Sequence, residues 1–372
     1  MWAVRLVAVL AGAAVVVSVL LSALRTVVVP RAQPVRLARA VFLGVRRVFE
    51  LRARPGRTYE ERDRVMALYA PAALLLLPGV WAASVMAGFT VLLWGMGVDS
   101  WRYAFYLSAD SLTTLGTFAA PDLPTTVATT VEAVLGLGLV ALLISYLPSI
   151  YGAFQRRELA VAMLETRAGD PPSPVELILR QHRIGRMEEL EDLWEQWLGW
   201  FADLEETHTS QASLPFFRSP TPTRSWITAA GCVLDGASLV TSVVDLPKSP
   251  RAQLCIRSGY LALRRISDFF QIPYEPDPRP DDPISIDRSE FDDACARLAA
   301  AGVPLVEDRD GAWRAFVGWR VNYDPVLLGL AGLVMAPYAM WSSDRSLPFR
   351  RPPVTHRKRR QVAPQASAWR RR

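Results

Sequence analysis

Three long runs without a charged residue restrict the fold of this chain more than any other feature of its sequence. They are Leu6 to Leu24, Val65 to Val98 and Ala133 to Phe154. A helix of roughly 20 apolar residues crosses a hydrocarbon layer about 30 Å thick, so each run is long enough to span a membrane. The second run contains Pro71 and Pro78 and has length to spare for a tilt or a kink.

The composition predicts a water-soluble part attached to these runs. Of the 372 residues, 51% are hydrophobic and 21% are charged, which is too apolar for an ordinary soluble protein and too charged for one lying wholly in lipid. These proportions exclude a collagen, a disulfide scaffold and a long disordered chain. The cysteines lie far apart, so we expect a reducing compartment and no disulfide framework. They are Cys232, Cys255 and Cys295.

Arginines predict the orientation, because positive residues near the ends of membrane helices stay on the cytoplasmic side. The loop between the first two runs is rich in arginine, whereas the segment before the third run contains only Arg102. We therefore expect the N-terminus outside and everything after about residue 158 in the cytoplasm. The preference for arginine over lysine fits a G+C-rich bacterial genome. The expected location is the bacterial inner (plasma) membrane, with several passes and a cytoplasmic C-terminus.

Two segments near the N-terminus allow alternatives. Residues 1–24 have the length of a signal peptide, with Arg5 as its charged start. No small-residue cleavage site is followed by secreted-type sequence, so we favour a retained membrane anchor. Residues 35–53 place apolar side chains on one helical side and arginines elsewhere. They form either a helix at the membrane interface or an amphipathic helix packed on the soluble part.

The segment between the second and third runs is aromatic and rich in hydroxyl groups. Trp101 to Leu112 is long enough for about three helical turns and too short to span a membrane. The turn Thr113 to Gly116 and a return bounded by Pro121 follow it. This order is typical of a re-entrant segment, which a membrane tolerates only where the backbone is buried in protein or lines a water-filled path. An ordinary exposed turn is the alternative.

The order of outer helix, short aromatic helix, Thr-Thr-Leu-Gly turn, proline and inner helix resembles the pore module of the potassium channel superfamily. The resemblance covers residues 66–157, about a quarter of the chain, and only the four-residue turn is specific. It implies a homotetramer around an axis, and a filter whose carbonyl oxygens replace the hydration shell of a monovalent cation, K⁺ in the family. The implied filter residues are Thr113, Thr114, Leu115, Gly116, Thr117 and Phe118.

The chain departs from the family filter, TTVGYGD, after its first glycine. Gly116 suits the alternating backbone conformation that stacked carbonyls require. Phe118, or Ala119 if one residue is inserted, stands where the family has its second glycine. Neither residue type adopts a positive φ without strain. This departure counts against high potassium selectivity. It leaves open a less selective pore, a pore for another ion, and a pore fold that conducts nothing.

The third run contains two glycines and a proline that could loosen it. Gly136, Gly138 and Pro148 are predicted as a gating hinge with a kink near the cytoplasmic mouth. Small residues also favour close packing between membrane helices, which explains the two glycines equally well.

The sequence after residue 157 predicts an α-helical cytoplasmic domain, because helix-like stretches alternate with proline-rich breaks. A stripe of tryptophans in the first of the helices is expected in the core. Pro325 to Ser343 is a fourth uncharged stretch, and we expect a buried helix there, since a crossing would place the basic C-terminus outside. The other helices expected are Glu188 to Glu206, Ser225 to Val243, Arg251 to Gln271, Arg288 to Ala301 and Ala312 to Val321.

No cofactor, metal site or enzyme is expected. The three histidines, which are His182, His208 and His356, are too scattered for a zinc site, and His208 is expected at the surface. No catalytic motif is found. The basic, proline-bearing tail after residue 344 is expected to be disordered. Together with the basic loop it is predicted to contact anionic lipid, and nucleic acid is not an expected partner.

The sequence therefore predicts an all-α membrane protein in five parts. These are an N-terminal transmembrane helix (1–29), a basic cytoplasmic amphipathic segment (30–65), a pore module (66–157), a helical cytoplasmic domain (158–343) and a basic tail (344–372). The predicted function is an ion channel for monovalent cations that is gated by the cytoplasmic domain. One alternative is a non-conducting scaffold or signalling protein that keeps the pore fold. Another is a three-helix receptor without a pore loop.

Overall fold

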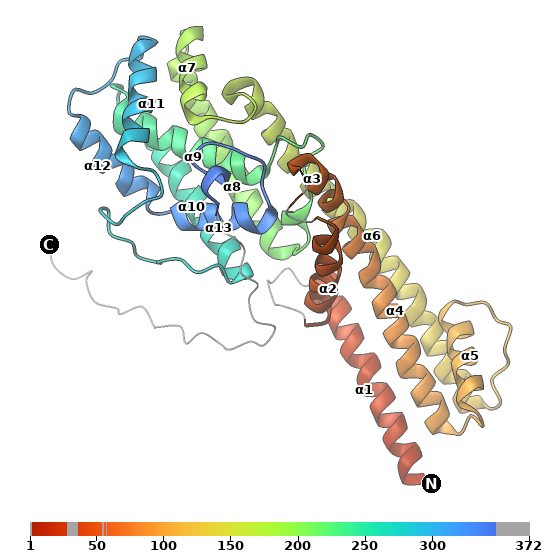
Figure 1. The fold of residues 1–372 in the computed structure, drawn as a ribbon. Coiled ribbons are helices and arrows are strands. Elements are labelled where there is room, and N and C mark those ends of the chain that lie inside the picture. The colour runs from red at the N-terminus through yellow and green to blue at the C-terminus, as the bar shows by residue number, and fades with distance from the viewer. Residues whose placement is uncertain (1, 28–35, 54–55, 57, 347–372) are drawn as a thin grey trace.

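A computed structural model describes residues 2–27, 36–53, 56 and 58–346 of the chain. Within these residues the fold is all-helical, as expected, and an isolated antiparallel bridge between Val244 and Leu305 is the one strand-like pairing. The predicted basic tail lies mostly outside the described residues, as does His356. The helices form two parts, a set of long rods at one end and a globular bundle at the other (Figure 1).

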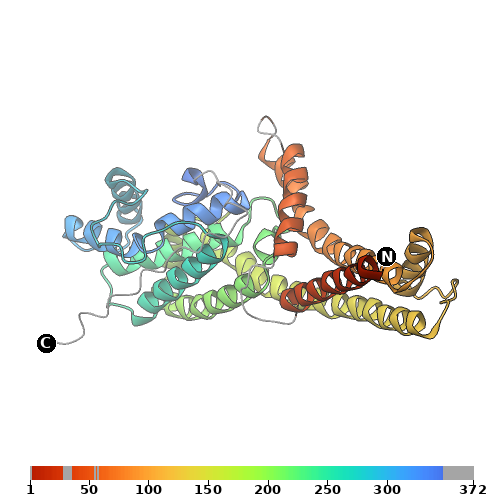
Figure 2. The same ribbon diagram turned by 90° about the horizontal axis from the view of Figure 1, so that it is seen from below.

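The rods are the helices that the apolar runs predicted. They are α1 (Trp2–Val27), α4 (Tyr69–Met96) and α6 (Leu123–Ala168), with the short α5 (Trp101–Leu112) beside the ends of α4 and α6 that lie away from the bundle. All three rods are long and apolar enough to cross a membrane. Figure 2 shows α6 continuing from the rods into the bundle. The helices are therefore those of a membrane-associated protein with a globular part.

Local sequence signals explain where these helices begin and end. Gly97, at φ 116°, ends α4, and the side chain of Ser100 caps α5 by accepting the amide of Tyr103. Asp122 caps α6 in the same way by accepting the amide of Thr125. The helix thus starts ten residues before the uncharged run. Counting charges placed its start too late, because the acidic residue Glu132 ends the uncharged run yet lies fully buried inside the helix.

Helices α1 and α4 pack closely along their length. A Cβ atom on Gly12 of α1 would lie only 2.4 Å from the carbonyl oxygen of Gly88 on α4, so nothing larger than glycine fits at this crossing. Above it, Val16, Val19 and Ala23 are buried against α4. Small residues that bring helix backbones together are the usual means of association between membrane helices, where lipid removes the hydrophobic driving force.

Two helices lie at the junction between rods and bundle, α2 (Arg36–Arg52) and α3 (Tyr59–Ala67). The inner side of α2 packs Phe42 and Phe49 against α3 and α4, and the buried guanidinium of Arg46 donates to the carbonyl oxygen of Leu333 at 2.9 Å. The packed alternative therefore describes this side of α2. Its outer side exposes Val48 and Leu51.

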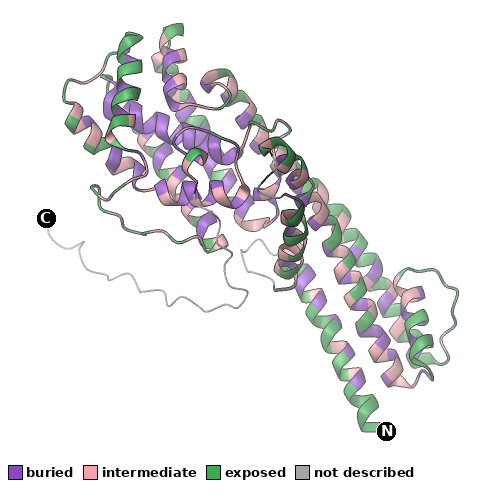
Figure 3. Cartoon of the chain, in the orientation of Figure 1, coloured by how far each residue is buried: buried purple, intermediate pink, exposed green. Residues whose placement is uncertain are grey.

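The globular bundle is built around α9, whose apolar window is 94% buried (Figure 3). By length and composition α9 is also a candidate span, but helices of the bundle cover it on every side, so its apolar surface is already removed from water. The bundle consists of α7 (Pro174–Ile184), α8 (Leu190–Ser210), α9 (Trp226–Val243), α10 (Pro250–Phe270), α11 (Arg288–Ala300), α12 (Arg309–Arg320) and α13 (Asp324–Val334), with short 3₁₀ turns at Met187–Glu189, Leu214–Phe216 and Ser343–Arg345. The tryptophans of α8 lie in the core, as predicted.

A buried ion pair ties α9 to α12 inside this core. Arg320 is fully buried, and its guanidinium donates to both carboxylate oxygens of Asp235 at 2.5 and 2.7 Å and to Asp324 at 2.7 Å. Such a group must be paired to lie in a core, because desolvation of a charge costs several kcal/mol.

The prediction of one helix from Pro325 to Ser343 was wrong in its length. Helix α13 is buried but ends at Val334, and Met335 adopts a left-handed conformation at φ 52°. Pro337 follows, which cannot continue a helix. The chain then folds back and buries Trp341 in the core.

The prediction of a surface position for His208 was also wrong. Its side chain is fully buried between Arg157 of α6, 3.3 Å from Nε2, and the ring of Trp226, 4.8 Å away between centroids. Arg157 itself is buried and donates to the carbonyl oxygens of Leu214 and Phe217 at 2.9 and 2.7 Å. The histidine therefore belongs to the contact that holds α6 to the bundle.

We expect His208 to make the fold sensitive to acid. Burial, and then the charge of Arg157, hold the pKa of His208 well below its usual value. The folded chain leaves this ring neutral while the unfolded chain protonates it below about pH 6.5, so this group's contribution to stability is lost as the pH falls, at up to about 1.4 kcal/mol per pH unit. His208→Gln should reduce the acid dependence of the unfolding temperature, measured by circular dichroism in detergent, whereas His182→Gln should not. Equal acid dependence in all three proteins would contradict this account.

Candidate functional site

Helix α5 runs from the outer ends of α4 and α6 toward their middles. The carbonyl oxygen of Leu112, at the end of α5, would lie 2.3 Å from a Cβ atom on Gly136. Gly136 is about 20 Å along α6 from its first residue, at 1.5 Å per residue. On the other side, the hydroxyl of Ser108 lies 3.0 Å from the carbonyl oxygen of Met86 on α4. The C-terminus of α5 therefore lies deep beside both rods.

The chain after α5 returns along the same helix to the outer end of α6. In this return segment, defined as Thr113–Ala119, Asp110 of α5 accepts the amide of Thr117 at 2.7 Å and that of Phe118 at 3.3 Å. The ring of Phe118 stacks on that of Tyr106, with 5.6 Å between centroids, and the hydroxyl of Tyr103 donates to the carbonyl oxygen of Ala119 at 2.7 Å. The residues of α5 that contact the return segment, Asp110, Tyr106 and Tyr103, are thus spaced about one helical turn apart.

The sign of the backbone φ angle alternates over three residues of the return segment. Thr114 and Gly116 have φ values of 56° and 72°, and Leu115 between them does not have a positive φ. Thr114 also closes α5, because its amide donates to the carbonyl of Ser111 while that of Leu115 donates to Asp110. This cap usually contains glycine, and threonine in the left-handed region costs about 1–2 kcal/mol. The strained position lies two residues after the end of α5.

The alternation ends with Gly116, and the second glycine of the resembled filter is missing from the residues that follow. Neither Phe118 nor Ala119 has a positive φ, as the steric cost for these residue types predicted. The first of the predicted filter residues, Thr113, turns its hydroxyl back to the carbonyl oxygen of Ala109 at 2.6 Å. The part of the segment with alternating hand is therefore short.

Amide and carbonyl groups of the return segment face different surroundings. The amides of Thr114, Leu115, Thr117 and Phe118 all donate to groups of α5. In contrast, none of the carbonyl oxygens from Thr113 to Phe118 accepts a hydrogen bond from the part of the chain that the structure describes. All of these residues are exposed. The segment therefore presents the carbonyl oxygens of residues 113–118 on its open side.

A polar seam joins α5 to α6 beneath this segment. The hydroxyl of Ser108 lies 2.5 Å from Oε1 of Glu132, and the hydroxyl of Ser111 donates to the carbonyl oxygen of Thr129. The close approach of Leu112 to Gly136 completes the seam one turn further along. Polar contacts of this kind hold helices together where no water competes.

The sequence reasoning did not single out two of the acidic residues that organise the site. Asp110 supports the return segment, and Glu132 anchors α5 to α6. Both lie among apolar residues of a membrane-associated segment, where an ionisable group is expensive and marks a functional position. That rule was the available signal for finding them.

One face of α6 is uncovered along the same stretch. Its apolar window is only 17% buried, and the exposed side chains recur at helical spacing (Figure 3). They are Leu123, Val127, Val131, Val134, Leu137, Val140 and Ile144. A single chain therefore leaves both the return segment and the helix behind it open on one side.

The predicted hinge residues have different surroundings. Gly136 is held against Leu112, which matches the packing alternative, whereas a Cβ atom on Gly138 would meet nothing within 4 Å. Pro148 lies inside α6, which continues through it to Ala168. A hinge at Gly138 and Pro148 stays a prediction.

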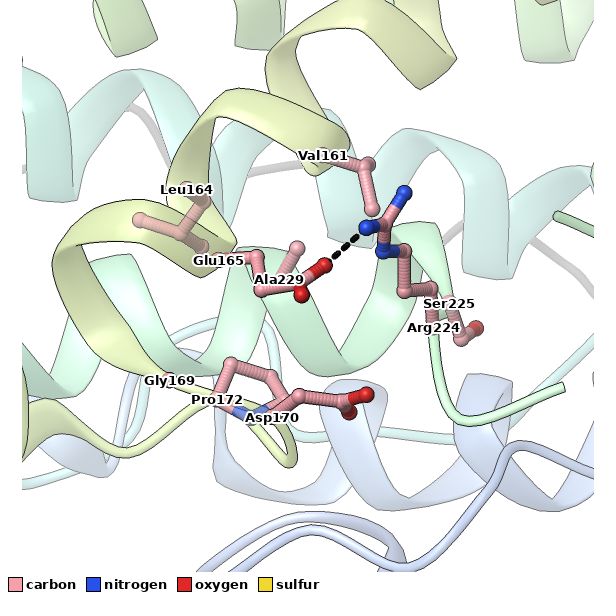
Figure 4. A pocket seen from close by; sticks show the side chains of 9 residues that line it. All are labelled: Val161, Leu164, Glu165, Gly169, Asp170, Pro172, Arg224, Ser225 and Ala229. Carbon is pink, nitrogen blue, oxygen red and sulfur yellow. Dashed lines mark ion pairs between the residues drawn. The ribbon is translucent and has the colours of Figure 1, made fainter. Parts of the chain in front are cut away.

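A small pocket lies further along α6, where Glu165 pairs with Arg224 and Asp170 accepts the hydroxyl of Thr223 at 2.6 Å (Figure 4). Its volume of about 10 Å³ holds about one water molecule. No group of three or more His, Cys, Asp or Glu side chains that could hold a metal ion is found among the described residues.

We expect the two neighbouring glycines of α6 to differ sharply on substitution. Gly136→Ala forces α6 away from the end of α5, so it should lower the free energy of unfolding by about 1–3 kcal/mol. Gly138→Ala adds a methyl group in open space and improves helix propensity, so stability should stay the same or rise by up to about 1 kcal/mol. Thermal unfolding in detergent measures both. Equal losses in the two variants would show that the seam does not restrict Gly136.

Comparison with known proteins provides no relative from which to transfer a role to these residues. No protein-family model matches the chain, and no curated protein or solved structure matches it at a significant level. The function of the return segment therefore has to be argued from its own geometry.

Proposed function

We propose that this chain is one subunit of a membrane pore for monovalent cations, and that residues 113–118 line its pathway. The observation that carries the proposal is the division of backbone groups in the return segment. The amides of Thr114, Leu115, Thr117 and Phe118 donate to α5, while the carbonyl oxygens from Thr113 to Phe118 accept nothing from the described chain and lie exposed. Rows of carbonyl oxygens are the groups with which proteins replace the water around a dehydrated cation.

The electrostatics of the site support a cation of single charge. Helix α5 ends at Leu112, so the negative pole of its dipole lies beside the open carbonyls. The nearest carboxylate, that of Asp110, is engaged by the amides of Thr117 and Phe118 behind the segment. Divalent cations require carboxylate ligands or retained water, whereas potassium and sodium accept neutral carbonyl oxygens.

The open surfaces of the single chain support assembly around the pathway. A line of carbonyls becomes a closed path only when further copies surround the same axis, and the uncovered face of α6 provides apolar surface for such contacts. The resemblance to the potassium channel superfamily makes four copies the proposed number. In this assembly the bundle is cytoplasmic and acts on the pore through α6, in a bacterial inner membrane.

Lipid is the second proposed partner. The outer side of α2 combines exposed Val48 and Leu51 with the exposed arginines Arg47 and Arg52. Such a surface at the cytoplasmic boundary suits anionic headgroups, at about 1 kcal/mol per basic residue near the membrane.

A non-conducting scaffold is the second candidate function, and one observation favours it. The alternation of backbone hand covers only Thr114 to Gly116, and the ring of Phe118 is stacked on Tyr106. Fewer aligned carbonyls mean fewer sites for a dehydrated ion. The position of α5 between the two rods argues against the receptor alternative. A surface loop would not contact Met86 of α4 and Gly136 of α6, as α5 does.

Ion flux in reconstituted vesicles tests the proposal. We expect purified protein to pass K⁺, with Na⁺ passing less well but measurably. Gly116→Val should reduce the flux by at least about tenfold, because a β-branched residue at φ 72° costs more than 1–2 kcal/mol and the space around Gly116 is otherwise open. Gly79→Ala, at an open position of α4, is the matched control and should leave the flux unchanged.

Each possible outcome of this experiment decides something. No flux above protein-free vesicles would favour the scaffold. Equal flux from Gly116→Val and the unaltered protein would place the pathway elsewhere in the chain. A monomer in detergent, measured by light scattering, would contradict the shared axis.

A further inference from the structure

Glu132 is the least expected residue within the rods. It lies in the apolar part of α6, about 14 Å from the start of the helix at 1.5 Å per residue, and its exposed fraction is 0%. An ionisable side chain at such a position is costly and demands a physical explanation. The pore proposed above assigns it no role.

The contacts of Glu132 pass through a single hydroxyl group. Oε1 lies 2.5 Å from Oγ of Ser108, and the same Oγ lies 3.0 Å from the carbonyl oxygen of Met86 on α4. Oε2 is buried and has no hydrogen-bond partner within the described residues. A serine hydroxyl has one hydrogen to donate, so it cannot donate to both neighbours at once.

Placing a proton on Glu132 resolves this conflict. The carboxyl then donates to Oγ of Ser108, and the hydroxyl donates onward to Met86. The remaining carboxyl oxygen is neutral, and its lack of a partner costs little. Without the proton, a buried charge would rest on one hydrogen bond with an unpaired oxygen beside it, which is far more costly.

No charged neighbour offsets such a charge in the described part of the chain. From α5 the group facing Glu132 is Ser108, and the nearest acid, Asp110, turns to Thr117 and Phe118. From α4 the facing group is the carbonyl of Met86, which also accepts the hydroxyl of Thr90. No ion pair with Glu132 is found among the described residues.

We propose that Glu132 is a proton-binding site inside the membrane helices. It holds its proton at neutral pH, and the neutral carboxyl links α6 to α5 and, through Ser108, to α4. When the proton is lost at alkaline pH, the hydroxyl of Ser108 donates to the carboxylate of Glu132 instead of to the carbonyl oxygen of Met86. The hydrogen bond to α4 is then broken, and a buried negative charge is left at the base of the return segment. The proposal concerns what Glu132 binds, so it stands whether or not the assembly conducts ions.

Infrared spectroscopy of the full chain in lipid detects this proton directly. At neutral pH we expect a carbonyl stretching band of a protonated carboxylic acid that disappears in Glu132→Gln. Glu158→Gln is the matched control on the same helix, because that carboxylate forms an ion pair with Arg157 at 2.8 Å. The band should survive in the control, and raising the pH should remove it reversibly from the unaltered protein.

Two further measurements keep the proposal testable if Glu132→Gln folds poorly. Ser108→Ala removes the acceptor of the carboxyl proton, so the band should move to higher wavenumber with the fold intact by circular dichroism. The unfolding temperature of the unaltered protein should fall from neutral to alkaline pH more steeply than that of a folded Glu132→Gln variant. Identical neutral-pH spectra for the unaltered protein and Glu132→Gln, or an unmoved band in Ser108→Ala, would overturn the proposal.

Discussion

Backbone groups that leave a helix inside a membrane must find partners in the protein, because hydrocarbon offers none. The return segment meets this requirement on one side only. Asp110 and the end of α5 take its amides, and the hydroxyl of Tyr103 takes the last carbonyl, that of Ala119. The carbonyls from Thr113 to Phe118 find no donor among the residues that the structure describes. The shape of α5, its depth beside α6 and the proposed ion pathway all depend on this one-sided satisfaction.

The arginines at the junction serve the fold as well as the orientation. Arg157, Arg46 and Arg218 donate to backbone carbonyls of the bundle rather than pointing into solvent. Two of these contacts reach the end of α13, where unpaired carbonyls carry the negative end of the helix dipole. The same residue type that predicts a cytoplasmic loop thus fastens that loop to the globular part.

Periodicity and charge counting predicted most of the long helices but missed α3 and α7, and they did not predict the contacts between helices. The limits of α5, expected at Trp101 to Leu112, agree with the structure, and those of α9 agree within one residue. The start of α6 was missed because the acidic Glu132 marked the end of the uncharged run, although it lies buried inside the helix. The burial of His208 was missed because its partner, Arg157, lies about fifty residues away in sequence. Long-range pairs of this kind leave no local pattern in a single sequence.

The unbroken length of α6 has a mechanical consequence. A helix of 46 residues extends about 69 Å at 1.5 Å per residue, and it is gripped at both ends, by the seam with α5 and by the bundle at Arg157. Because α6 is a long rigid helix, a small rotation of the bundle would produce a larger sideways displacement of its N-terminal end beside α5. Pro148 lies between these two contacts and lacks a backbone donor, so bending at the hinge predicted there would decouple the two ends of the helix.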